Sequence, residues 1–357
     1  MSLCLPSRAD AVQRSLIDLS ANENPLGPSP RVANAIMASL DRLHRYPDKD
    51  GSRLRAALAS KLGVAPRQIV LGNGSCEIIE LAARACLAPS DEAIIAVPSF
   101  LPYQSAVERA GGRKVLIPLR DHHHDLNAML ERVNSRTRLV IIGNPNNPTG
   151  TTVGASALAW FLDRLPEEVL VVLDEAYFEY VERKDFPASL EYVAQGRPVL
   201  VLRSLSKAYG LAGLRIGYAV ASAKVAQRVN AMRQHFNTNA LAQVAAIAAL
   251  EDEEHLRRSV AHCSAAKSYL YRALDTLGFD QVRSDANFLL VRVGGGEDVG
   301  RFLEQRGILV KGMTAFGLPE YIRVSAGLAE DNEYFIDALR GIFREYQPAA
   351  SMQIDER

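Results

Sequence analysis

The sequence predicts an α/β protein with a mostly parallel β-sheet that is covered by helices on both faces. Short runs rich in Val, Ile and Leu recur between residues 68 and 206, and segments with helical periodicity lie between them. Such continuous apolar runs are typical of strands that are buried on both faces of a parallel sheet. The runs end at Gly, Asn, Pro, Ser or acidic residues. Because ligands bind beyond the carboxyl ends of such strands, these polar residues are the candidates for chemistry.

The expected elements follow one another in chain order. Strands are predicted in segments 68–75, 92–99, 113–119, 137–150, 168–177 and 198–206. Helices are predicted in segments 52–63, 76–88, 155–165, 222–236 and 238–252.

The pattern changes after about residue 255, where a long helical segment leads into a smaller α+β unit. We therefore expect a large domain over residues 41–255, which carries the candidate site, and a small C-terminal domain over residues 256–357. Residues 1–40 are rich in proline and lack a strand pattern, so they are expected to form an arm that packs on the small domain or on a partner subunit.

Composition excludes several classes of partner. The 357 residues carry 41 basic and 41 acidic side chains and have no long run of one sign, which argues against nucleic acid and anionic membranes as partners. Cys4, Cys76, Cys86 and Cys263 form no metal-type or redox-type spacing, so four free thiols in a reducing compartment are expected. With no leader-like segment and no long apolar run, a cytoplasmic protein without a membrane span is predicted.

Two polar turns follow predicted strands. In the turn at residues 72–77, glycines precede Ser75 at a helix start, where backbone N–H groups favour a phosphate. The turn lacks the lysine of a P-loop and is also compatible with an ordinary strand-to-helix connection that has Ser75 as N-cap. In the turn at residues 144–150, two prolines restrict the backbone around Asn146 and Asn147. A purely structural turn is the alternative there.

Charged residues occupy two further strand ends. Asp174 ends an apolar strand and is followed by Tyr177, so its carboxylate needs donors or a cation unless it is only a helix N-cap. Lys207 lies among small and apolar residues, which lower the pKa of a lysine and favour the neutral amine that forms Schiff bases. Arg215 is suited to clamp a phosphate. A solvated lysine and a structural ion pair are the alternatives.

The last candidates for functional residues are a tyrosine, an arginine and a run of three histidines. Tyr46 precedes a proline and has extended backbone, and its alternative role is to anchor a loop. Arg323 lies within an apolar strand, so it either faces a bound anion or faces water at a sheet edge. The run at residues 122–124 holds three histidines in a polar turn. Consecutive residues do not point at one centre, so no metal is expected.

Together these residues supply what pyridoxal 5′-phosphate (PLP) requires: a Schiff-base lysine, an acid for the ring nitrogen, donors for the ring oxygen and a phosphate cup. The chain resembles the fold-type I PLP enzymes of the aspartate aminotransferase superfamily, and within them the histidinol-phosphate aminotransferases. The segments that carry the resemblance are NENPLGPSP, RYPD, GNGS, NPNNPTG, DEAY, SLSKAYGLAGLRIGY and RVSAG. The resemblance spans about residues 20–345 and implies a seven-stranded, mostly parallel sheet.

The resemblance also implies roles for individual residues. Lys207 is expected to bind PLP covalently and to move the substrate proton. Asp174 is expected to pair with the pyridinium N–H, and Asn147 and Tyr177 with the phenolate oxygen. Phe100 matches the aromatic residue that stacks on the ring.

Further roles concern the phosphate, the partner subunit and the substrate. The expected phosphate cup comprises Gly74, Ser75, Cys76, Ser204 and Arg215. Tyr46 matches a tyrosine that reaches the cofactor phosphate of the neighbouring subunit, which implies a homodimer with shared active sites. Arg323 matches the arginine that binds the substrate α-carboxylate, and Asn24 and Lys311 are further candidates for substrate binding.

The implied activity is ping-pong transfer of an amino group from a donor such as glutamate to an oxo acid, with imidazole-acetol phosphate as the expected acceptor. Cys76 stands where the subfamily commonly has an acid, Lys49 where it has a proline, and Lys311 where many members have an arginine. Aminotransferases for aromatic or other amino acids, and a threonine-phosphate decarboxylase-like lyase, are alternatives. A PLP-sensing regulator would need a DNA-binding domain, for which only about 40 residues precede the fold.

Overall fold

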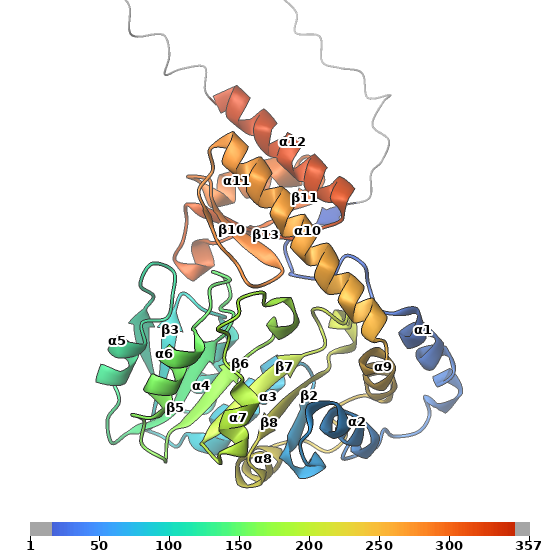
Figure 1. Cartoon of the computed structure of the whole chain (residues 1–357), viewed down its shortest axis with the longest axis vertical. Helices are drawn as coiled ribbons and strands as arrows, with labels where there is room; N and C mark the ends of the chain where they lie inside the picture. The colour runs from blue at the N-terminus through green and yellow to red at the C-terminus, as the bar shows by residue number, and fades with distance from the viewer. Residues whose placement is uncertain (1–15, 347–357) are drawn as a thin grey trace, which may run out of the picture.

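A seven-stranded sheet forms the centre of the larger part of the protein, which is described by a computed structural model over residues 16–346 (Figure 1). The strand order is β2-β8-β7-β6-β5-β3-β4. Strand β8 is antiparallel to both of its neighbours, and the pairs among the other strands are parallel. The prediction of a mostly parallel, seven-stranded sheet is confirmed. The strands are β2 (Ile69–Gly72), β3 (Glu92–Val97), β4 (Arg113–Pro118), β5 (Thr137–Gly143), β6 (Leu170–Asp174), β7 (Val199–Ser204) and β8 (Gly217–Ala221).

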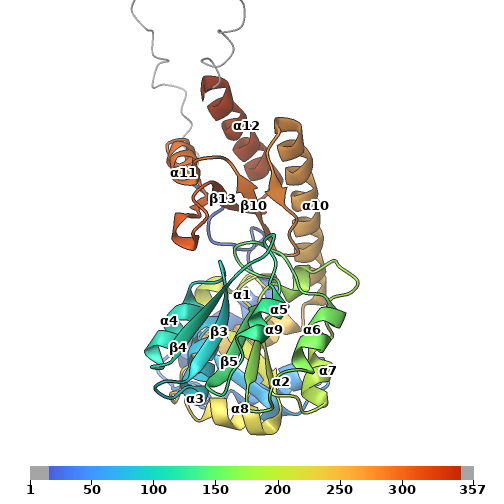
Figure 2. The same ribbon diagram turned by 90° about the vertical axis from the view of Figure 1, so that its left-hand side faces the viewer.

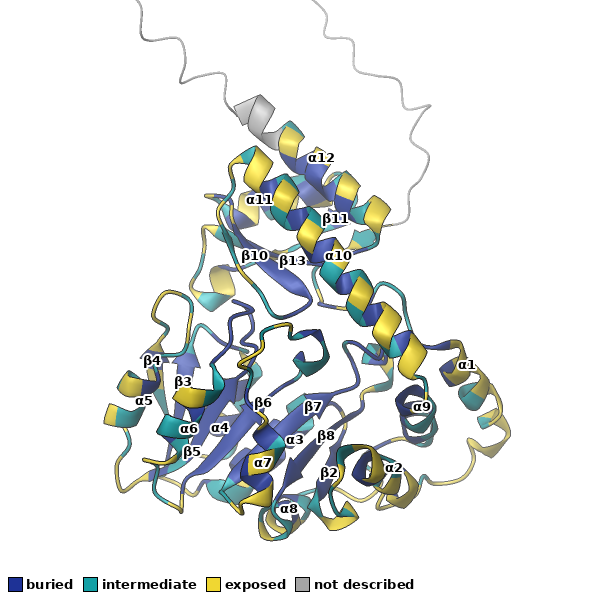
Figure 3. Ribbon diagram, viewed as in Figure 1, coloured by how far each residue is buried: buried dark blue, intermediate teal, exposed yellow. Residues whose placement is uncertain are grey.

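Helices cover both faces of this sheet because successive side chains of each strand point to opposite faces. In β6, Val171 and Leu173 belong to one apolar core, and Leu170 and Val172 belong to the other. Figure 3 shows the sheet buried between helices whose outer surfaces are exposed. The helices of the first face are α2 (Ser52–Leu62), α5 (Leu126–Glu131), α6 (Ala155–Leu162), α7 (Ser189–Ala194) and α9 (Ala240–Leu250). Those of the second face are α3 (Ser75–Cys86), α4 (Pro102–Arg109) and α8 (Ala223–Asn230).

A four-stranded antiparallel sheet in the order β12-β13-β10-β9 lies to one side of the large sheet, together with three helices (Figures 1 and 2). Its strands are β9 (Gln281–Val282), β10 (Phe288–Arg292), β12 (Lys311–Gly312) and β13 (Tyr321–Ser325). Its helices are α10 (Glu253–Leu277), α11 (Gly296–Glu304) and α12 (Ala329–Tyr346). The expected boundary near residue 255 falls at the start of α10. There, the side chain of Asp252 caps the helix by accepting a hydrogen bond from the backbone of His255 (3.1 Å).

The N-terminal segment joins both parts. Strand β1 (Ile17–Asp18) pairs in parallel with β11 (Ile308–Leu309), although the sequence before residue 40 has no strand pattern. Two residues are too few for a strand pattern to be visible in the sequence. Helix α1 (Pro30–Met37) packs on α9 of the large part. The start of the predicted arm, with Cys4, lies outside the described residues.

Short 3₁₀ helices complete the structure: η1 (Leu40–Arg42), η2 (Pro66–Gln68), η3 (Phe178–Tyr180), η4 (Ala212–Leu214) and η5 (Thr314–Phe316). Across residues 16–346, no helix has both the length and the apolar character that a membrane span requires.

The small sheet has an apolar core of its own, so shortening a side chain in that core is expected to lower the stability of the protein. Leu339 of α12 is fully buried in that core, whereas Leu116 of β4 is 42% exposed. We expect Leu339→Ala to lower the free energy of unfolding by about 2–5 kcal/mol, because it removes buried methyl groups and leaves a cavity. Urea denaturation measures this change. Leu116→Ala is the matched control, and an equal loss in the two variants would contradict the assignment of this core.

Candidate active site

A cavity of about 380 Å³ lies where the carboxyl ends of β5, β6 and β7 and the start of α3 face strand β13. Its wall combines segments that are far apart in the sequence, including residues 21–23 of the N-terminal arm. Most of the residues predicted for the site line it, namely Ser75, Cys76, Phe100, Asn147, Asp174, Tyr177, Ser204, Lys207, Arg215 and Arg323. The structure thus brings together side chains that the sequence analysis selected one cluster at a time.

Lys207 lies in the turn after β7, and its amine faces the cavity. Its Nζ donates a hydrogen bond to the carbonyl oxygen of Ala21 (3.1 Å) and lies 5.8 Å from the ring centre of Tyr177. Burial, together with the positive charge of Arg323 as a smaller cause, lowers the pKa of Lys207 to about 8. The neutral, nucleophilic form of the amine is therefore more populated near neutral pH than it is for an ordinary lysine.

Asp174 is the last residue of β6 and is 4% exposed. Its Oδ2 accepts a hydrogen bond from the hydroxyl of Tyr103 (2.7 Å), and its Oδ1 accepts one from the backbone N–H of Ala176 (3.1 Å). Burial raises the pKa of Asp174 to about 6, and the two hydrogen bonds oppose this rise. The carboxylate is thus held ionised near neutral pH and in a fixed orientation.

Tyr103 is a site residue that the sequence analysis missed. It is buried in α4 and contacts Phe100 edge to face, with 5.6 Å between ring centres. The available signal was its spacing of three residues from Phe100, which places both rings on one side of a helical turn.

Tyr177 is the centre of a hydrogen-bond network that joins three segments. Its hydroxyl accepts from the Nδ2 of Asn22 (3.0 Å) and from the Nδ2 of Asn147 (3.3 Å). The Oδ1 of Asn147 in turn accepts from the Nη1 of Arg323 (2.6 Å), whose Nη2 donates to the carbonyl oxygen of Ser20 (2.6 Å). The Nε of Arg323 is buried and has no hydrogen-bond partner among the described residues. This guanidinium is therefore positioned to take an anionic ligand.

The turn before α3 forms an anion cup. Gly74, rather than Ser75, is the N-cap of the helix and has a positive φ of 81°. A Cβ on Gly74 would lie 2.4 Å from the Nη2 of Arg215, so only glycine lets the guanidinium approach the turn. The free N–H groups of the first helical turn and the Arg215 guanidinium provide positive potential at one end of the cavity.

Ser204 and Cys76 complete the cup. The Oγ of Ser204 accepts from the backbone N–H of Ser206 (3.1 Å) and lines the same cavity. Burial and the nearby charge of Asp174 raise the pKa of the Cys76 thiol, so this residue contributes no negative charge at the cup.

Three predicted residues lie elsewhere in the described structure. The Nδ2 of Asn24 donates to the carbonyl oxygen of Ala208 (3.0 Å) and to the Oγ of Ser259 (2.9 Å), and its neighbour Asn22 faces the cavity instead. Lys311 is paired with Arg323 across β12 and β13, but its side chain is exposed. Tyr46 is 83% exposed and outside the cavity wall of its own chain.

The three histidines of residues 122–124 diverge. His124 contacts the carbonyl oxygen of Gly143 through its Nε2 (2.9 Å), whereas the ring of His122 contacts Tyr321 at 5.7 Å. Within residues 16–346, no three His, Cys, Asp or Glu side chains are grouped so as to hold a metal ion.

Comparison with known proteins agrees with this geometry. Residues 14–339 match the sequence model of the family "Aminotransferase class I and II". The chain belongs to this family. The predicted membership in the aminotransferases is therefore confirmed, and the family match covers both parts of the fold.

Individual aminotransferases are similar over nearly their whole length. A histidinol-phosphate aminotransferase of Moorella thermoacetica is 46% identical in an alignment over 340 residues that covers 93% of this chain and 88% of the relative. The crystal structure of the histidinol-phosphate aminotransferase of Sinorhizobium meliloti in complex with pyridoxal-5′-phosphate has a TM-score of 0.86 at 29% identity and covers 94% of this chain and 93% of its own. An L-threonine-O-3-phosphate decarboxylase of Porphyromonas gingivalis has a TM-score of 0.81 at 25% identity, with coverage of 92% and 100%.

The environment of Lys207 predicts the pH dependence of its reactivity. Reductive methylation with formaldehyde requires the neutral amine, so we expect the rate at Lys207 to be half-maximal near pH 8. In Arg323→Met the midpoint is expected to rise, because removal of a neighbouring cation favours the protonated amine. Peptide mass spectrometry across a pH series measures both midpoints.

Arg292→Met, at an exposed position of β10, serves as the matched control and is expected to leave the midpoint unchanged. A wild-type midpoint near the ordinary lysine value of about 10.4 would refute the described environment.

Proposed function

We propose that this protein is a PLP-dependent histidinol-phosphate aminotransferase that takes an amino group from a donor such as glutamate and gives it to imidazole-acetol phosphate. The observation that carries the proposal is that an amine, a buried carboxylate and an anion cup share one cavity wall, at Lys207, Asp174 and the turn with Gly74. The 46% identity with a histidinol-phosphate aminotransferase supports this acceptor.

The residues of the cavity fit PLP. The phosphate would be held by the start of α3, Ser204 and Arg215, where the missing Cβ of Gly74 leaves room beside the guanidinium. Asp174 would face the ring nitrogen, and Tyr177 with Asn147 would face the ring oxygen. Phe100 would cover one face of the ring. When bound, the cofactor supplies an electron sink for negative charge at the substrate carbon that bears the amino group.

The protein supplies binding and proton transfer. Lys207 would hold the cofactor through its Nζ, and once released from that bond the same nitrogen would carry the proton that leaves the substrate Cα. Asp174 would keep the ring nitrogen protonated, because hydrogen bonds from Tyr103 and the backbone of Ala176 favour its charged form. Arg323, which lines the cavity, would bind the substrate α-carboxylate.

The proposal includes a homodimer in the cytoplasm with shared active sites. We define the apolar ridge as five exposed side chains from the end of α1, the α1–α2 segment and the α8–α9 loop. They are Met37, Leu40, Leu43, Tyr46 and Phe236, which are 61%, 49%, 57%, 83% and 39% exposed. Exposed apolar side chains that gather from separate segments, as the stacked rings of Tyr46 and Phe236 do, are typical of protein interfaces, and a second copy of the chain is the occupant that the proposal assigns to the ridge.

The substrate assignment predicts the outcome of an acceptor screen. With glutamate as donor, imidazole-acetol phosphate is expected to be converted with the highest kcat/KM among a panel that includes aromatic oxo acids. Amino acid analysis of the products measures each rate, and Lys207→Ala is expected to abolish them all. Release of carbon dioxide from an amino acid phosphate, without consumption of an oxo acid, would instead identify a lyase.

Tyr103 predicts a further effect on catalysis. We expect Tyr103→Phe to lower kcat by about 10-fold, since a charged hydrogen bond to Asp174 contributes about 1.5–3 kcal/mol. Loss of this donor raises the pKa of Asp174, so the acid limb of the pH–kcat profile is expected to move to higher pH. Steady-state kinetics across pH measures the shift. The same loss of kcat with an unchanged acid limb would mean that Tyr103 only fills space.

A further inference from the structure

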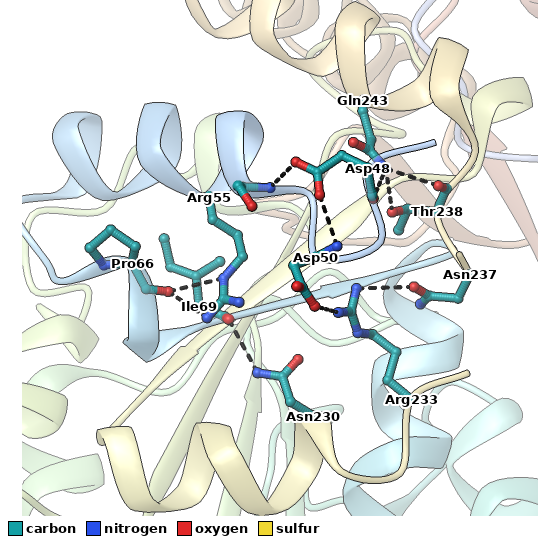
Figure 4. Close-up of polar contacts among 11 residues, drawn as sticks. Asp48, Asp50, Arg55, Pro66, Ile69, Asn230, Arg233, Asn237, Thr238 and Gln243 are labelled. Carbon is teal, nitrogen blue, oxygen red and sulfur yellow. Dashed lines mark hydrogen bonds and ion pairs between the residues drawn. The ribbon is translucent and has the colours of Figure 1, made fainter. Parts of the chain in front are cut away.

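A series of polar contacts leads from Asp50, in the segment that carries the apolar ridge, to the anion cup at the start of α3. Figure 4 shows its first half, in which Arg233 lies between Asp50 and Asn237. The Nη2 of Arg233 donates to the Oδ1 of Asp50 (3.4 Å), and its Nη1 donates to the Oδ1 of Asn237 (3.2 Å). Asp50 follows Tyr46 by four residues, so this end of the chain belongs to the segment that carries the ridge.

The second half reaches the cup itself. The Nδ2 of Asn237 donates to the Oε2 of Glu77 (2.6 Å). The same oxygen accepts the backbone N–H of Asn73 (2.5 Å), the residue before Gly74. Glu77 also lies in the first turn of α3, where its charge is favoured by the helix dipole. One carboxylate therefore fixes both the start of the phosphate turn and the loop that holds Asn237.

Burial makes the middle of this chain sensitive to its partners. The side chain of Arg233 is 9% exposed, whereas that of Asp50 is 60% exposed. Breaking the contact on either side would leave a buried guanidinium with one partner fewer, which is costly. The position of Arg233 thus depends on Asn237, and the position of Asn237 depends on Glu77.

The backbone at the ridge end is strained. Phe236 has a φ of 62°, in the left-handed region that is unfavourable for a bulky residue. Its ring stacks on Tyr46 with 4.8 Å between centres, and it lies directly before Asn237 in the chain. Strain of this kind persists only where the surroundings over-determine the conformation, and the contacts of Arg233 and Asn237 do so here. The conformation of the loop that carries Phe236 is therefore stabilised by contacts that lead to the anion cup.

We propose that Glu77, Asn237 and Arg233 are positioning residues that couple anion binding in the cup to the shape of the apolar ridge, and hence to subunit association. This inference rests on the proposed function, which supplies PLP as the phosphate ligand and a second copy of the chain as the partner. A phosphate in the cup orders the turn at Asn73 and Gly74, which stabilises the Glu77 contacts and, through Asn237, the loop of Phe236. By reciprocity, association of subunits strengthens PLP binding by the same factor.

The test compares the dimer dissociation constant with and without PLP by analytical ultracentrifugation. In the wild type, saturating PLP is expected to tighten the dimer by at least about 10-fold, within the usual range of such couplings. In Glu77→Ala this ratio is expected to fall by about 5-fold or more. Glu77→Gln keeps an acceptor at the same place and is expected to restore most of the ratio.

Glu80→Ala is the matched control, because Glu80 lies on the same helix and forms an exposed ion pair with Arg109. It is expected to leave the ratio at its wild-type value. Asn237→Ala breaks the chain at a second, uncharged point and is expected to lower the ratio as Glu77→Ala does, which keeps the test valid if one variant does not fold. Circular dichroism confirms folding.

The outcomes separate the two proposals. A wild-type protein that stays monomeric, or binds no PLP, would overturn the proposed function. A wild-type dimer that binds PLP, with an unchanged coupling ratio in folded Glu77→Ala or Asn237→Ala, would overturn only the positioning role. A fall in the ratio for Glu80→Ala equal to that for Glu77→Ala would do the same.

Discussion

The buried guanidinium of Arg323 is the contact on which the site depends. It extends from β13 of the small sheet and donates to Asn147 after β5 and to the backbone of Ser20 in the N-terminal arm. Asn147 then orients Tyr177, so the small part, the arm and the large sheet meet in one hydrogen-bond network. A buried cation with an unused N–H edge is stable only where an anion or polar groups surround it. The hydrogen bonds of Arg323 thus join these segments at the cavity and also place a cation there that can bind a carboxylate.

Charge explains why the cavity favours anionic ligands. Its wall carries the cations Lys207, Arg215 and Arg323 but only two carboxylates, those of Glu23 and Asp174. The excess positive charge, added to burial, lowers the pKa of Lys207. A phosphate at the cup and a carboxylate at Arg323 would compensate this excess positive charge at two separate places. Binding energy at these two sites would orient the cofactor and the substrate relative to the amine of Lys207.

The strand-end residues that line the cavity could be selected from the sequence because each follows a continuous apolar run, and parallel strands bring their carboxyl ends to one edge. Lys207, Asp174 and the turn at Gly74 could be found from the sequence in this way. The arm was harder, since Asn22 and Asn24 are chemically alike and only the tertiary contacts with Tyr177 and Ser259 show which one faces the cavity. The partner of Asn237 could not be predicted, because Glu77 lies 160 residues away. Such contacts leave no local pattern.

Lys207 is the residue that we propose to bind the cofactor covalently at this cavity. The most direct measurement is to incubate the purified protein with PLP, reduce it with sodium borohydride and map the modified lysine by peptide mass spectrometry. One phosphopyridoxyl group per chain on Lys207, prevented by Lys207→Ala, is the result that the structure predicts. Modification at other lysines with Lys207 unmodified, or no stable adduct, would show that Lys207 does not bind the cofactor covalently.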